Sequence, residues 1–82
     1  APQEADGSLL AALKALRSRL AQEAGVPAYI VFSNAALADM AALRPLDMEE
    51  FLKVSGVGRV KAERYGEDFL RAIRDWRAGV RE

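Results

Sequence analysis

Apolar residues recur every three or four positions along much of this 82-residue chain, which is the spacing of one face of an α-helix. Two long stretches follow this spacing, one with Leu9, Leu13, Leu16 and Leu20 and one with Phe69, Ile73, Trp76 and Val80. Ser8 is suited to cap the first stretch, and Gly25 is suited to end it, with Pro27 just beyond. The pattern therefore predicts a helix that starts near Ser8 and another that covers the end of the chain.

A dense apolar segment, residues 26–32, follows the first helix. Its β-branched and aromatic residues are compatible with a strand. No other segment offers a partner strand, so a short turn or 3₁₀ segment that enters the core is the better prediction. Ser33 then caps a second helix, which ends at Arg44-Pro45 because the residue before proline is pushed out of the α region.

A third, short helix is predicted after Asp47, because an acidic cap followed three residues later by Glu50 forms a capping-box pattern. The glycines of residues 55–58 break this helix, and the last helix begins near Arg59. Gly66 lies inside that last helix and costs roughly 1 kcal/mol relative to alanine. A kink or a close helix crossing is therefore expected at Gly66.

These elements make an all-α chain, and its length allows one modest domain. A chain of this size buries only about 60% of its unfolded surface, so one core and no deep cleft are expected. Residues 1–7 are polar and contain proline and glycine, which predicts a linker or tail. The folded domain is expected over residues 8–78, with residues 79–82 as a second tail.

Composition excludes several kinds of chemistry. The chain has no cysteine and no histidine, so it lacks a thiolate nucleophile, the usual general base and the commonest zinc ligands. We expect no metal, no cofactor and no catalytic activity in this domain. No apolar run approaches the ~20 residues that span a bilayer, and the N-terminus does not resemble a signal peptide. An intracellular, cytoplasmic protein is expected.

Charge is unevenly distributed, although the net charge is zero. Residues 1–50 contain four Lys or Arg and seven Asp or Glu, a balance of −3, and residues 51–82 have a balance of +3. Proteins dedicated to nucleic acid are usually basic overall. Any nucleic-acid binding by this chain should therefore be local and weak.

The most informative motif is Gly56-Val57-Gly58 between the last two helices. Glycine at both positions indicates positive φ angles or a close backbone approach, and Val57 is expected to point into the core. The helix that follows presents unpaired N–H groups, a natural place for a phosphate. The basic residues of the segment, with a local balance of +3, are Lys53, Arg59, Lys61 and Arg64. The alternative is a tight interhelical turn beside a solvated basic face.

An ordered set of residues over positions 8–77 resembles the HRDC family, found near the C-termini of RecQ helicases and in ribonuclease D relatives. The first specific part is the sequence VPAYIVFSN at residues 26–34, and the second is GVGRVKAERYG at residues 56–66. The resemblance implies a compact bundle of about five short helices with a helix-hairpin-helix-like turn. It also implies a non-catalytic accessory module whose parent is an ATP-dependent DNA helicase.

Family members bind single-stranded or branched DNA weakly, or contact proteins, and help direct the helicase to recombination and repair intermediates. By this resemblance, Tyr29 matches a tyrosine beside the DNA-facing surface, and Lys53, Gly56, Gly58, Arg59, Lys61 and Arg64 lie in or around the matching hairpin. Tyr29 could stack on an unpaired base or belong to the core. A nucleoid-associated location and a monomer in isolation are expected.

The acidic residues Asp47, Glu49 and Glu50 support a second interpretation. Carboxylates at a helix start favour the helix dipole, which alone can explain them. They could also form a docking surface for a basic partner, such as the parent helicase core or a neighbouring domain. DNA binding and protein interaction therefore remain two hypotheses, and they are not exclusive.

Overall fold

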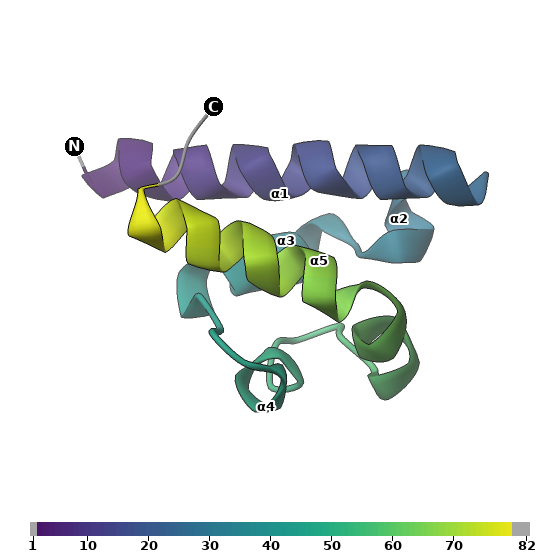
Figure 1. The fold of residues 1–82 in the computed structure, drawn as a ribbon. Helices are drawn as coiled ribbons and strands as arrows, with labels where there is room; N and C mark the ends of the chain where they lie inside the picture. Colours follow the sequence, from purple (N-terminus) through teal and green to yellow (C-terminus); the bar gives the residue numbers. More distant parts are fainter. Residues whose placement is uncertain (1, 80–82) are drawn as a thin grey trace.

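The computed structural model describes the backbone of residues 2–79 and the side chains of residues 8–79. Five helices occur in this part of the chain: α1 (Pro2–Ala24), α2 (Ala28–Val31), α3 (Asn34–Leu43), α4 (Met48–Phe51) and α5 (Arg59–Ala78). The long helices α1 and α5 lie across one another, and α3 packs beside them (Figure 1). The predicted all-α bundle of about five helices is confirmed, although α1 and α5 are long rather than short.

Helix α1 begins at Pro2, earlier than the sequence predicts. Proline suits the first helical position because it has no N–H to leave unpaired and its φ is already helical. The prediction that the first helix starts at a Ser8 cap is therefore wrong, because Ser8 lies inside α1. At its other end the helix stops as expected, at Gly25 with a φ of 71°.

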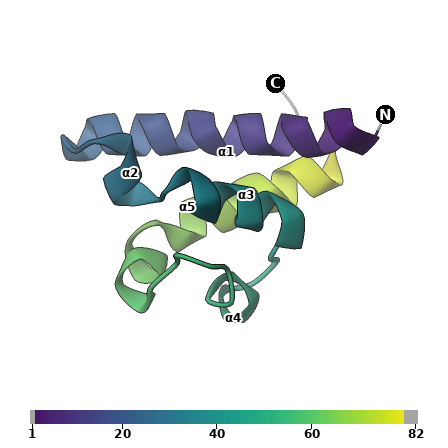
Figure 2. The same ribbon diagram turned by 180° about the vertical axis from the view of Figure 1, so that it is seen from behind.

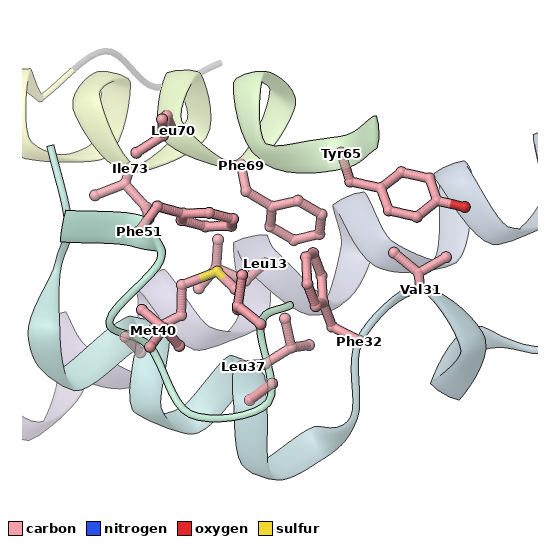
Figure 3. Packing of buried hydrophobic residues seen from close by; sticks show 14 of the residues in the cluster. Leu13, Val31, Phe32, Leu37, Met40, Phe51, Tyr65, Phe69, Leu70 and Ile73 are labelled. Atoms are coloured by element: carbon pink, nitrogen blue, oxygen red, sulfur yellow. The ribbon is translucent and has the colours of Figure 1, made fainter. Parts of the chain in front are cut away.

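The apolar segment 26–32 forms the single turn of α2 and then an extended residue, Phe32, rather than a strand. Phe32 is fully buried and makes edge-to-face contacts with Phe51, Tyr65 and Phe69, at ring-centroid distances of 6.0, 6.1 and 5.0 Å. Figure 3 shows this ring between α5 and α3. The Arg17 guanidinium of α1 donates to the Phe32 carbonyl at 3.0 Å. The segment enters the core, as predicted.

Helix α3 has the ends that the sequence predicts. The Ala36 N–H donates to the Ser33 hydroxyl at 3.1 Å, which caps the first turn. At the other end Arg44 adopts the left-handed conformation, with a φ of 51°, and its N–H donates to the Met40 carbonyl. Pro45 follows and is buried. The connector, which we define as residues 44–47, leads from there to α4.

Helix α4 is a single turn that begins with the predicted cap. The Glu50 N–H donates to the Asp47 carboxylate at 2.9 Å, and the Glu50 carboxylate accepts from the Leu46 N–H at 2.9 Å. The Arg74 guanidinium of α5 donates twice to the Leu46 carbonyl, at 3.0 and 2.8 Å. These hydrogen bonds attach the connector and α4 to the C-terminal half of α5.

Helix α5 crosses α4 closely at Gly66. A Cβ built at Gly66 would lie 2.9 Å from the Met48 methyl carbon, so the predicted close crossing is confirmed. Phe69 and Ile73 are fully buried, and Trp76 is half-buried with the Arg44 guanidinium 5.0 Å above its ring. Val80, which the sequence predicts to be buried, lies outside the described residues, as do residues 81 and 82 of the predicted tail.

Candidate nucleic-acid interface

The hairpin, which we define as residues 52–58 between α4 and α5, is held against the core by its two valines. Val54 and Val57 are both buried, which confirms the predicted position of Val57. The Ser55 N–H donates to the Asp39 carboxylate of α3 at 2.8 Å. A Cβ built at Gly56 would lie 3.2 Å from the Ala36 Cβ. The hairpin therefore packs tightly on α3.

The two hairpin glycines, Gly56 and Gly58, differ in their backbone conformation and in the space around them. Gly56 has a φ of 81°, a conformation that side chains disfavour, and it also packs closely on Ala36. Gly58 has a φ of −91°, and nothing lies within 4 Å of a Cβ built there. The expectation of positive φ or a close backbone approach is correct for Gly56. At Gly58 the φ is not positive and no other part of the described chain lies close, so approach to an external group stays a prediction. Open space around Gly58 is what a backbone that meets an external group would need.

Gly58 is also the N-cap of α5, and no side chain of the described residues caps this helix. The Ala62 N–H is the first to find an intrahelical acceptor, the Gly58 carbonyl at 2.9 Å. The preceding N–H groups of the first turn point outward, as at every helix start. They and the dipole favour an anion in front of Gly58.

Three basic residues lie on the first two turns of α5. Arg59 and Arg64 are exposed, and Lys61 is half-buried. Residues four apart share a helix face, so Arg64 lies beside Val60, whose side chain is 70% exposed. Lys61 lies on the face of Tyr65, which contacts Phe32 at the end of α2. The charge of residues 54–64 is +2.

Tyr29 projects from α2 and is 67% exposed, so it does not belong to the core. In both ribbon views α2 and the start of α5 lie toward the same end of the domain (Figures 1 and 2). The contact between Phe32 and Tyr65 joins these two elements. The structure thus brings Tyr29, Arg59, Lys61 and Arg64 to one end of the molecule.

Lys53 has different surroundings from the other basic residues. It lines a hollow of about 230 Å³ together with Leu43, Pro45 and Glu50. Its positive charge therefore shares this hollow with the carboxylate of Glu50. The predicted basic set of four is divided, with Lys53 in the hollow and the other three on α5.

The acidic residues Asp47, Glu49 and Glu50 lie beside the middle and end of α5. Met48 touches Gly66, and the Leu46 carbonyl accepts from Arg74. At 1.5 Å per residue, Gly66 and Arg74 lie about 10 and 22 Å along the helix from Arg59. The carboxylates therefore do not surround the first turn of α5. Asp47 and Glu50 also hold α4 by hydrogen bonds, as expected for a helix start.

Several residues that shape this site were missed in the sequence. Asp39 and Ala36 of α3 position the hairpin, and Val60 adds exposed apolar surface. The pairing of Asp39 with Ser55 joins residues 16 apart and leaves no local pattern. The exposure of Val60 could have been found, because it lies four residues before Arg64 and off the buried face of the helix.

Comparisons with known proteins agree with the helical fold. The HRDC domain family matches residues 6–73. The ATP-dependent DNA helicase RecQ of Haemophilus influenzae is 40% identical over 73 residues, which are 89% of this chain and 12% of that helicase. The ATP-dependent DNA helicase UvrD2 of Mycobacterium tuberculosis is 39% identical over 71 residues, 87% of this chain and 10% of that helicase. The solved structure of D. radiodurans RecQ HRDC domain 3 matches with a TM-score of 0.82 and 40% identity, covering 84% of this chain and 91% of that one.

The fold and the hairpin define a small helical accessory module. The chain belongs to the HRDC family, as the match over residues 6–73 and the relatives show. HRDC domains are accessory, non-catalytic domains of ATP-dependent DNA helicases such as RecQ. This chain spans only about a tenth of the length of the helicases it matches.

Two further findings concern the described residues. None of their helices is long and apolar enough to cross a bilayer. Within the same part of the chain, no three of the acidic side chains come together as metal ligands would.

Proposed function

We propose that this domain binds single-stranded DNA weakly, as an accessory module of a RecQ-type helicase. The observation that supports the proposal is the uncapped start of α5, where Arg59, Lys61 and Arg64 stand beside open backbone at Gly58. Phosphates would accept hydrogen bonds from the outward N–H groups and pair with these basic side chains, and no side chain would hydrogen-bond to a base edge. Binding of this kind depends on phosphate charge and is insensitive to sequence.

Tyr29 supplies the contact that favours unpaired DNA. An exposed aromatic ring can stack on any base, a contact worth about 1–3 kcal/mol. A duplex offers no free base face to this ring, whereas single strands and the open arms of branched DNA do. The domain would thereby help direct the parent helicase to recombination and repair intermediates near the nucleoid.

Fluorescence anisotropy with a labelled single-stranded oligonucleotide tests the proposal. Three neutralised phosphates predict a slope of about −2 in log affinity against log salt. The dissociation constant should lie on the order of 10⁻⁴ to 10⁻⁶ M, as for nonspecific contacts. Tyr29→Ala should weaken binding, whereas Tyr29→Phe, which keeps the ring, should not.

A charge-matched pair of variants makes the test specific to the start of α5. Lys61→Glu/Arg64→Glu should abolish binding, whereas Arg71→Glu/Arg77→Glu changes the net charge equally and should retain most of it. Arg71 and Arg77 are exposed on later turns of the same helix. Equal loss in both variants would mean that only overall charge matters, and no binding at low salt would remove the proposal.

A second candidate function is contact with a protein, such as the helicase core or a neighbouring domain. Asp47, Glu49 and Glu50 support it, because they are exposed and lie away from the start of α5. Titration of the isotope-labelled chain with the parent helicase core would test it by chemical shifts at these residues. An absence of shifts at high concentration would contradict it.

A further inference from the structure

Helix α2 carries the exposed Tyr29, yet it is a single turn of four residues. A helix this short is not stable by itself, because isolated helices need about 12–15 residues even to be marginally stable. No side chain of the described residues caps its start at Pro27, and Val31 is its buried residue. The orientation of Tyr29 therefore depends on contacts that hold α2 from outside.

Helix α1 holds α2 at both ends. Before α2, the Val26 N–H donates to the Ala21 carbonyl of α1 at 3.0 Å. After α2, the Arg17 guanidinium of α1 donates to the Phe32 carbonyl at 3.0 Å. In both ribbon views α2 lies against the C-terminal part of α1 (Figures 1 and 2). The two hydrogen bonds thus attach the segment that contains Tyr29 to α1 on either side of the turn.

Of these two hydrogen bonds, the second depends on a side chain. Phe32 is fully buried, so water does not reach its carbonyl. Its backbone is extended, with a φ of −152°, so the helix ends there and supplies no helical donor for that carbonyl. Buried carbonyls in folded proteins are almost always hydrogen-bonded. Arg17 meets this requirement from 15 residues away.

The Arg17 side chain is itself fixed in place. It is half-buried, its Nη1 is on the Phe32 carbonyl and its Nε is buried. The side chain of Arg19, two residues further along α1, is by contrast 63% exposed. The guanidinium of Arg17 is therefore held against the protein, which favours a role within the domain over direct contact with a phosphate.

Tyr29 lies three residues before Phe32, which is less than one helical turn. A movement of the Phe32 backbone is therefore passed on to Tyr29. The Phe32 ring is held separately, by edge-to-face contacts that include Phe69 at 5.0 Å. Loss of the Arg17 hydrogen bond should loosen the backbone of α2 while this ring keeps its place in the core.

We propose that Arg17 is a positioning residue for single-stranded DNA. Through the Phe32 carbonyl it holds α2 in the orientation in which the Tyr29 ring meets an unpaired base. The inference rests on the proposed DNA binding and adds a residue of α1 that serves it without touching the nucleic acid. Arg17 acts on the base contact and leaves the phosphate contacts at the start of α5 as they are.

A double-mutant cycle tests this inference by fluorescence anisotropy with a labelled single-stranded oligonucleotide. Low salt strengthens the phosphate contacts, so that binding by Tyr29→Ala stays measurable. Tyr29→Ala should weaken binding about tenfold through loss of stacking. Arg17→Met keeps a long side chain without a donor and should weaken binding about threefold, a part of the stacking effect. In the Tyr29→Ala background it should change affinity less than about 1.5-fold, because the ring on which it acts is gone.

Two controls separate positioning from charge. The slope of log affinity against log salt should stay at about −2 in Arg17→Met, because no phosphate contact is lost. Arg19→Met removes the same charge from an exposed position of α1 and should leave binding unchanged. Circular dichroism at the assay temperature verifies that each variant is folded. If Arg17→Met unfolds the chain, Arg17→Gln, with a neutral polar side chain, takes its place in the cycle.

Other results would overturn the inference in distinguishable ways. No loss from Arg17→Met, or the same loss with and without the Tyr29 ring, would remove it and leave DNA binding standing. A salt slope reduced by about one would mean that Arg17 contacts a phosphate itself. An equal loss in Arg19→Met would mean that charge alone explains both variants. No binding by the unsubstituted chain at low salt would remove the proposed function, and this inference with it.

Discussion

The hairpin end of the domain and the connector with its hollow both place exposed apolar side chains beside charged ones. At the hairpin end, Val60 is exposed on the helix face of Arg64, and Tyr29 is exposed on α2. At the connector, Leu43 and Leu46 are exposed beside residues of both charges, with Glu50 and Lys53 around the hollow and Arg74 on the Leu46 carbonyl. The basic start of α5 is suited to DNA phosphates, whereas the connector carries charges of both signs, as a surface for protein contact commonly does. Zero net charge is therefore compatible with two specific surfaces.

The two regions are also held in place differently. The hairpin depends on buried valines and on Gly56, where the positive φ and the close approach to Ala36 both disfavour a side chain. The connector depends on exposed hydrogen bonds that the carboxylates of Asp47 and Glu50 accept and that Arg74 donates. Packing tolerates few substitutions, whereas exposed hydrogen bonds are individually replaceable. The hairpin should therefore be the more easily damaged of the two.

The largest effect is expected for Gly56→Ala. The alanine would have to adopt a φ of 81°, and its Cβ would lie 3.2 Å from the Ala36 Cβ. The free energy of unfolding should therefore fall by about 1–3 kcal/mol. Gly58→Ala meets no neighbour and has an ordinary φ, so the loss should be about 0.5 kcal/mol from a poorer cap. Urea unfolding of both variants measures the difference.

Equal destabilisation by the two substitutions would contradict this distinction between the glycines. A variant of Gly56 that is fully stable would mean that the loop can move away from α3. DNA binding adds a second measurement. Gly58→Ala should weaken it if the backbone there approaches phosphate, although its effect on stability is small.

The sequence was sufficient for the helical elements and for much of the hairpin. The helices follow from the spacing of apolar residues, and the Ser33 and Asp47 caps and the buried Val57 also depend on local chemistry, so the sequence predicts these features correctly. Trp76, which the spacing predicts to be buried, is half-buried. The start of α1 was not predicted, because proline and glycine in residues 1–7 indicate a linker by composition. Composition does not show that Pro2 stands where a helix tolerates proline best.

The surfaces could be predicted only in part. Residue types identified the basic and acidic groups, but their placement depends on how α4 crosses α5 at Gly66. That crossing places the acidic segment beside the middle of α5, and Lys53 lines the hollow together with Glu50. The hollow was not foreseen, because its lining comes from α3, the connector and the segment around α4. Tertiary contacts of this kind leave no periodic signal in a single chain.

An intermediate effect is expected at the connector for Asp47→Ala. This substitution removes the acceptor for the Glu50 N–H, and loss of an N-cap typically costs about 1 kcal/mol. Glu49 lies two residues after Asp47 and is exposed, so Glu49→Ala should change the unfolding free energy by less than about 0.5 kcal/mol. Thermal unfolding of the two variants compares them directly. Equal losses would mean that total charge at the helix start matters more than the hydrogen bond.

The smallest effect is expected for Arg74→Ala, which removes both hydrogen bonds to the Leu46 carbonyl. That carbonyl can bind water instead, because Leu46 is partly exposed, so the loss should be about 0.5–1 kcal/mol. Arg71→Ala, on the same helix and exposed, is the control and should be neutral. The distinguishing measurement is hydrogen exchange at residues 44–50, which should accelerate in the Arg74 variant while exchange in the hairpin is unchanged. Faster exchange in the hairpin as well would mean that the two regions are coupled through α5 and do not respond independently.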